Sequence, residues 1–209
     1  YRENEELDGY DPYSNSKSCS ELVTHSYKHS FFTDKEGQPI IPISTARAGN
    51  VIGGGDFAND RIIPDSVRAA EKHEDIVVRN PFSTRPYQHV LEPLSGYMLL
   101  AQKMWDAPTE YCEGWNFGPE SESVLTVWEV ATAIINNFGF GELKDVSGPN
   151  ALHEANLLML NINKAKTRLG WTPRLNAKET AVLTSDWYKR YKTENVYDLC
   201  VEEINKFLA

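Results

Sequence analysis

Two residues of this 209-residue chain, Tyr13 and Lys17, have types and a spacing that can support proton transfer from a hydroxyl group, although an isolated pair of this kind is more often an exposed surface pair. On a helix, residues four apart lie on one face, one turn from each other. A lysine ammonium beside a phenol lowers the phenol pKa, which makes the tyrosine a proton acceptor near neutral pH. The ammonium can also donate to a ribose hydroxyl. Tyr188 and Lys192 repeat the spacing in a charged segment, where we expect Tyr188 at the surface.

A second candidate is the loop that contains Asn50 and the glycines Gly53, Gly54 and Gly55. It follows an apolar stretch whose composition predicts a buried strand. In open α/β sheets, ligands bind to loops at the carboxyl ends of parallel strands. Glycines allow a ligand to approach the backbone closely. A plain glycine-rich turn explains this segment equally well, and its spacing is not that of a dinucleotide-binding fingerprint.

The third set of candidates is the arginines Arg61, Arg79 and Arg85. A guanidinium group matches phosphate oxygens with two parallel hydrogen bonds, so these residues are candidate phosphate ligands, although any one of them could be an ordinary surface residue. The formal net charge of the chain is −9 at pH 7. This charge disfavours nucleic acids and anionic membranes as partners.

Other groups of chemical interest give weaker signals. Glu21, His25 and His29 lie one turn apart and could imitate a metal-binding face, but a helix surface is the better interpretation and we expect no metal. His153 and Glu154 follow a proline in a loop, where an acid–base role and a structural role are both open. Three widely separated cysteines indicate a reducing, cytoplasmic location.

The elements that must position these residues alternate between helices and strands. Periodicity, Pro, Gly and capping residues predict helices over 13–32, 62–72, 91–105, 126–138, 162–169 and 177–191, and strands over 39–47, 76–79 and 114–118. This alternation predicts an α/β fold with a mainly parallel sheet.

The order of the motifs resembles that of a known family. Pro12-Tyr-Ser-Asn-Ser-Lys17 is followed by Ala46-Arg-Ala-Gly-Asn-Val-Ile-Gly53, Arg85-Pro-Tyr-Gln-His-Val90, Trp115-Asn-Phe-Gly118 and Leu169-Gly-Trp-Thr-Pro173. This series resembles the extended short-chain dehydrogenase/reductases that act on nucleotide sugars. The residues of its motifs are most similar to those of the 4,6-dehydratases in this family. The resemblance implies the C-terminal part of a Rossmann-type parallel sheet with a smaller, mostly helical substrate-binding subdomain. It assigns residues 1–50 to the NAD-binding domain and 51–209 to the nucleotide-sugar region.

The resemblance also implies a reaction and residue roles. NAD oxidises C4 of CDP-glucose, water leaves across C5–C6, and C6 is reduced. Tyr13 is the active-site phenol and Lys17 binds the nicotinamide ribose, with the Val51 backbone close to the nicotinamide. The remaining positions are expected to bind the nucleotide sugar: Asn50, Arg61, Arg85, Asn116, His153 and Glu154. A homodimer through the helices over 13–32 and 91–105 is expected as well.

Three alternative functions are compatible with the sequence. They are a nucleotide-sugar 4-epimerase, a decarboxylase of the same family and a non-catalytic nucleotide-sugar-binding module. The family's glycine-rich phosphate loop and its elimination residues precede the Tyr-Lys helix, and only twelve residues precede Tyr13 here. We therefore expect the chain to be the later portion of a larger enzyme, inactive by itself.

Overall fold

The computed structural model describes residues 1–148 and 159–209, and these residues form two compact units. Each unit is assembled from segments that are distant in the sequence. The first comprises Tyr1–Ala48, Leu94–Phe117 and Leu160–Thr172, and the second comprises Gly49–Pro93, Gly118–Met159 and Pro173–Ala209.

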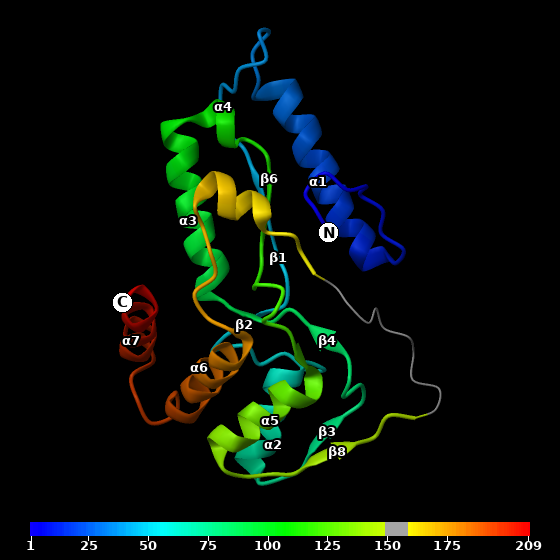
Figure 1. Ribbon diagram of the computed structural model, residues 1–209, viewed down its shortest axis with the longest axis vertical. Helices are drawn as coiled ribbons and strands as arrows, with labels where there is room; N and C mark the ends of the chain where they lie inside the picture. Colours follow the sequence, from blue (N-terminus) through cyan, green and yellow to red (C-terminus); the bar gives the residue numbers. More distant parts are fainter. Residues whose placement is uncertain (149–158) are drawn as a thin grey trace. The chain divides into compact units, whose positions relative to one another are not determined.

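The first unit is built around two parallel strands, which Figure 1 shows side by side. Its elements are α1 (Pro12–Phe31), β1 (Thr45–Ala48), most of α3 (Leu91–Asp106), α4 (Pro108–Tyr111), β6 (Gly114–Phe117) and η1 (Ala165–Leu169). The completely buried rings of Trp115 and Phe117 form the centre of its core. Gly96 allows α3 to approach β6, because a Cβ at that position would lie 2.3 Å from the Phe117 ring.

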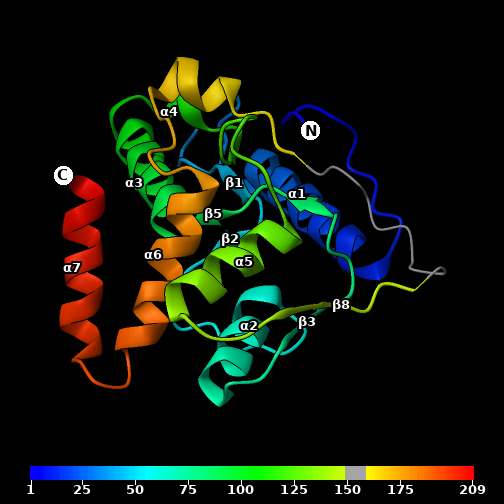
Figure 2. The ribbon, with the colours of Figure 1, turned by 60° about the horizontal axis from the view of Figure 1, so that its bottom comes forward.

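The second unit has a helical core of α2, α5 and α6, the last of which also contacts α7 (Figure 2). Its elements are β2 (Val51–Ile52), α2 (Ile62–Lys72), β3 (Ile76–Val78), β4 (Thr84–Arg85), β5 (Gln88–His89), β7 (Leu125–Thr126), α5 (Val127–Phe138), β8 (Leu143–Asp145), α6 (Ala177–Arg190) and α7 (Val196–Leu208). Ile63, Val130, Ile134 and Trp187 are among the buried residues that hold these helices together.

The described strands form four two-stranded sheets: β1–β6, β2–β5, β3–β8 and β4–β7. The first three pairs are parallel and the fourth is antiparallel. The predominance of parallel pairs between strands separated by helices agrees with the predicted α/β class.

Capping residues explain why the helices begin where they do. Asp11 accepts hydrogen bonds from the backbone of Tyr13 and Ser14, and Pro12 occupies the first turn of α1. Thr126 and Glu129 form a reciprocal capping box at the start of α5. These local interactions place the starts of α1 and α5 within one residue of the predicted positions.

Two predictions about burial were wrong. The apolar segment before β1 is not a buried strand, because β1 covers only Thr45–Ala48 while Ile40 and Ile41 are exposed. Tyr188 is not a surface residue; only 1% of it is exposed. Helix α7 was not predicted at all.

Candidate active site

Tyr13 and Lys17 lie in the first turns of α1, on the same face of the helix, as the spacing predicts. The Lys17 ammonium nitrogen lies 5.3 Å from the centroid of the Tyr13 ring. The Tyr13 side chain is exposed, and its hydroxyl makes no hydrogen bond with any other residue that the structure describes. The pair is therefore accessible to a ligand.

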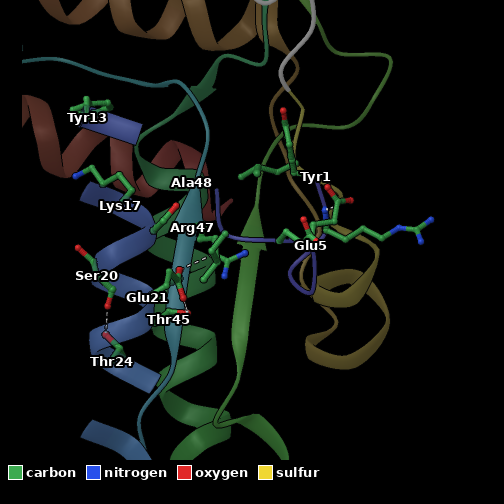
Figure 3. Close-up of a pocket in the computed structure, with 16 residues that line it drawn as sticks. Tyr1, Glu5, Tyr13, Lys17, Ser20, Glu21, Thr24, Thr45, Arg47 and Ala48 are labelled. Carbon is green, nitrogen blue, oxygen red and sulfur yellow. Dashed lines mark hydrogen bonds and ion pairs between the residues drawn. The ribbon is translucent and has the colours of Figure 1, made fainter. Parts of the chain in front are cut away.

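These two side chains line an open cleft of about 750 Å³ in the first unit (Figure 3). One wall is the face of α1 that carries Tyr13, Lys17 and Glu21, and strand β1 contributes a second. The polypeptide that begins at Tyr1 completes the lining. A cleft of this size, with a phenol and an ammonium at one end, can hold a polar small molecule.

Glu21 connects α1 to β1 across this cleft. Its carboxylate accepts a hydrogen bond of 2.6 Å from Arg47 Nε and one of 2.7 Å from Thr45 Oγ1. Burial raises the pKa of Glu21, but the bonds from Arg47 and Thr45 outweigh it, so the pKa lies below its usual range. Glu21 is therefore ionised at neutral pH and fully engaged with the strand.

Asn116, predicted to contact the nucleotide, is completely buried in the first unit. Its side-chain amide donates to the backbone carbonyls of Tyr1 and Asn161, and its backbone N–H donates to Glu3 Oε1. The residue joins three segments that are far apart in the sequence.

In the second unit, Asn50 and Val51 lie directly beside the segment that follows Arg85. Val51 is the register partner of Gln88 in the β2–β5 pair. Gln88 N–H donates to the Asn50 carbonyl at 3.0 Å. The structure thus brings together two of the predicted substrate-binding segments, which are about 35 residues apart in the sequence.

The glycine run that follows β2 is packed against the protein's own side chains. A Cβ at Gly54 would lie 2.1 Å from the Trp187 ring, and one at Gly53 would lie 2.8 Å from Val90 Cγ1. The Tyr188 hydroxyl donates to the Asp56 carbonyl at 2.6 Å. Helix α6 therefore holds this loop, and burial raises the pKa of Tyr188 to about 12, which keeps its hydroxyl protonated.

The predicted phosphate-binding arginines have different surroundings. Arg61 begins α2 and forms an exposed ion pair with Asp56, with Nη1 and Oδ2 3.0 Å apart. Arg79 forms a longer pair with Asp60, at 3.4 Å. Arg85 lies in β4, where Nη1 donates to the Thr84 carbonyl.

Three buried polar residues after Arg85 were not predicted to belong to the site: Gln88, His89 and Glu92. Burial lowers the pKa of His89 to about 4, so this residue is neutral at physiological pH. The Glu92 carboxylate accepts hydrogen bonds from the backbone N–H groups of Arg174 and Leu175.

The remaining predicted positions, His153 and Glu154, lie outside the described residues. Within the described ranges, no group of three or more His, Cys, Asp or Glu side chains is arranged to hold a metal ion. In those ranges there is also no helix whose length and apolar character would allow it to cross a membrane.

Comparison with known proteins gives one close sequence relative. No family model matches the chain. A CDP-glucose 4,6-dehydratase of Salmonella typhimurium strain LT2 is 43% identical over 211 residues, covering 100% of this chain. The predicted resemblance is confirmed. The chain spans 59% of the length of this dehydratase.

Solved structures establish the fold. The dTDP-glucose 4,6-dehydratase of Bacillus anthracis str. Ames, in complex with NAD, matches with a TM-score of 0.70 and 20% identity, over 95% of this chain and 58% of that one. A UDP-glucose 4-epimerase of Stenotrophomonas maltophila, with bound NAD and formylated UDP-arabinopyranose, matches with a TM-score of 0.74 and 18% identity, over 92% and 59%. The chain has the Rossmann-type α/β fold of these enzymes.

Proposed function

We propose that this chain belongs to the extended short-chain dehydrogenase/reductases and takes part in the NAD-dependent dehydration of CDP-glucose to CDP-4-keto-6-deoxyglucose. The observation that carries the proposal is the 43% identity to a CDP-glucose 4,6-dehydratase along the whole chain. The accessible Tyr13–Lys17 pair supports it, because the first step of such a dehydration removes a proton from a sugar hydroxyl.

Tyr13 and Lys17 fit the nicotinamide end of NAD, since a phenol and an ammonium at one end of an open cleft can receive hydroxyl groups. When bound, NAD supplies the oxidation at C4 and the reduction at C6. Tyr13, as a phenolate, accepts the proton of the C4 hydroxyl and becomes a neutral phenol, and the Lys17 charge stabilises the phenolate form before this transfer. Lys17 also donates to the ribose, and the Val51 backbone borders the nicotinamide.

The 209 residues contain no Gly-x-Gly-x-x-Gly segment, and so lack the helix N-terminus that this segment opens for a pyrophosphate. We therefore propose that the chain by itself binds NAD weakly and turns over no substrate. Titration calorimetry with NAD tests this, and tight stoichiometric binding would contradict it.

We propose that residues 51–209, interleaved with the last Rossmann elements, contain the nucleotide-sugar region. Asn50 contacts the sugar nucleotide, and Arg61 and Arg85 hold the diphosphate with their guanidinium groups. We propose that Asn116 supports the part of the site that binds the nucleotide, through the segments that it joins, and that His153 and Glu154 belong to the substrate-binding residues.

The alternative enzymatic function is a 4-epimerase, which the likeness to the UDP-glucose 4-epimerase structure favours at the level of fold. The decisive experiment gives CDP-, UDP- and dTDP-glucose in turn to the protein as its organism makes it and follows the 4-keto-6-deoxy product. Product from CDP-glucose supports the proposal. Formation of CDP-galactose without water loss identifies an epimerase, and binding without turnover indicates a non-catalytic module.

Tyr13→Phe tests the proton-accepting role of Tyr13, because it removes only the hydroxyl. We expect turnover to fall about 10²- to 10⁴-fold, as for loss of a general base. Tyr10→Phe is the matched variant, since Tyr10 lies in the same segment and is fully exposed. Equal activity of the Tyr13 and Tyr10 variants would refute the assigned role.

We also propose a homodimer through α1 and α3, in a cytoplasmic setting where Cys19, Cys112 and Cys200 stay free, as they are in the structure. Both helices expose large apolar side chains, including Tyr27 and Phe31 on α1. Sedimentation equilibrium of Phe31→Glu tests the interface, with Phe57→Glu as the control at an exposed site in the second unit. A dimer unaffected by Phe31→Glu would exclude α1 from it.

A further inference from the structure

Lys17 has two potential partners on its own helix, one turn away in each direction. Tyr13 lies four residues before it and Glu21 four residues after it. Residues with this spacing are neighbours on a helix surface, so the ammonium could lie over the phenol or pair with the carboxylate. The structure shows the first arrangement, with Nζ 5.3 Å from the Tyr13 ring centroid.

The alternative partner is occupied by the neighbouring strand. Figure 3 shows Glu21 turned towards β1, whereas Lys17 extends away from it. Both carboxylate oxygens of Glu21 are used, one by Arg47 Nε at 2.6 Å and the other by Thr45 Oγ1 at 2.7 Å. Arg47 and Glu21 side chains are each about one-fifth to one-quarter exposed, so this interaction is better shielded than a surface pair.

We propose that Arg47 is a positioning residue that sequesters the Glu21 carboxylate and thereby leaves the Lys17 ammonium to Tyr13. The inference rests on the proposed function only for its relevance to catalysis, since the arrangement itself is a property of α1 and β1. Lys17 has no ion pair with any residue in the described ranges, as sequestration requires.

The two competing contacts of Lys17 have similar strengths, which makes the competition sensitive to Arg47. A Lys–Glu pair at this spacing and a cation–π contact at an exposed site each contribute only a small free energy. A free Glu21 would therefore draw the ammonium from Tyr13 for about half of the time. An arginine on β1, at the wall of the cleft opposite α1, would thus set the occupancy of the catalytic contact.

The experiment measures the Lys17–Tyr13 contact by NMR in the 209-residue chain, without cofactor or substrate. The Tyr13 ring current shifts the Lys17 ε protons upfield, and Tyr13→Leu gives the value without the ring. We expect Arg47→Met to lose about half of this shift, because Glu21 then competes. The double variant Arg47→Met/Glu21→Gln should return to the wild-type shift, and Glu21→Gln alone should keep it.

Three outcomes would overturn the proposal: an unchanged shift in Arg47→Met, no recovery in the double variant, or an equal loss in Glu21→Gln alone. If Arg47→Met gives no dispersed spectrum, Thr45→Val replaces it and frees one Glu21 oxygen. Its expected loss is smaller and is again reversed by Glu21→Gln; no change would overturn the proposal. Absence of turnover by the protein as its organism makes it would refute the proposed function but would leave these spectra unaffected.

Discussion

Glu203 gives the sharpest test of how the second unit is held together. It lies on the inward face of α7, is only 8% exposed, and has the Asp186 carboxylate nearby. Burial first, and then Asp186, raise the pKa of Glu203 from 4.5 to about 7, against smaller opposing effects of Lys206 and Arg190. Ionisation of the Glu203 carboxyl is therefore less favourable in the folded protein than in the unfolded chain.

The pH dependence follows from the direction of this shift. Between pH 4.5 and 7 the folded state binds more protons than the unfolded state, so stability falls as the pH rises through this window. A shift of about 2.5 units corresponds to a loss of about 3 kcal/mol above pH 7. At pH 5.5, where much of the group is still protonated in the folded state, the loss is about 1.4 kcal/mol.

Glu203→Gln replaces the carboxyl with a neutral group of the same shape and should remove this loss. We expect the variant to be more stable than the wild type, with an advantage that grows by about 2 kcal/mol from pH 5.5 to pH 8.5. Urea unfolding followed by tryptophan fluorescence measures it, because buried Trp187 belongs to the same core. An advantage that does not change with pH would refute the reasoning.

Glu202, the neighbouring residue, is the matched control. Hydrogen bonds from Arg190 and Lys206 lower the pKa of Glu202 to about 2. Its contribution to stability is present above the unfolded pKa and is lost only as the pH falls towards 2, so it is constant between pH 5.5 and 8.5. Glu202→Gln should therefore destabilise the chain, and equally at both pH values.

Three further substitutions test packing and capping. Gly54→Ala should destabilise the second unit by about 1–3 kcal/mol in urea unfolding, because its methyl group would overlap the Trp187 ring. Thr126→Ala should lower the free energy of unfolding by about 1 kcal/mol through loss of the α5 cap, with a matching decrease in helical circular dichroism. Tyr188→Phe should cost about 1 kcal/mol, because the partly buried Asp56 carbonyl loses its donor, and hydrogen exchange of the loop should accelerate.

Gly54→Ala and Tyr188→Phe each have a control within the chain. Gly148→Ala meets no atom within 4 Å of the added Cβ and should be nearly neutral. Tyr197→Phe removes a hydroxyl from an exposed tyrosine of α7, and should leave both stability and loop exchange unchanged. Equal effects of Tyr188→Phe and Tyr197→Phe would mean that the bond to Asp56 contributes nothing.

Local chemistry explains which parts of the fold were predictable. The helix over 62–72 was predicted with its observed bounds, because apolar residues at helical spacing lie between a loop and a left-handed His73. Thr126 was identified as a cap because threonine precedes a helical pattern with glutamate three residues later. The Tyr13–Lys17 site was predictable for the same reason, since four residues of one helix suffice to specify it.

Long-range packing explains the rest. Ile40 and Ile41 have the composition of a buried strand, and nothing in their own segment reveals that no layer covers them. Tyr188 has charged neighbours, and its burial depends on the loop around Asp56, more than 130 residues earlier. Arg47 and Glu21 form a pair only because β1 and α1 meet in space, so neither was predicted to matter for Lys17.

The Arg61–Asp56 pair raises the question of how a strongly acidic chain could bind the anionic substrate that we propose for it. The pair is largely exposed, with 65% of the Arg61 side chain accessible, and such pairs contribute only about 0–1 kcal/mol. A diphosphate carries more negative charge than one carboxylate, so it can displace Asp56 from the guanidinium at little cost. Asp56 would thus pair with the Arg61 guanidinium only until a diphosphate binds there.

This argument predicts opposite effects for the two members of the pair. Asp56→Asn removes the competing charge but keeps the amide oxygen that can accept from Ala58 N–H, and it should tighten CDP binding by up to about fivefold. Arg61→Ala should weaken CDP binding, with Lys144→Ala as the control at another exposed, paired cation of the second unit. Calorimetric titration of CDP into each variant measures both effects. If Asp56→Asn weakens binding as Arg61→Ala does, Asp56 orients the guanidinium instead of competing for it, and the substrate must be held by the pair as a unit.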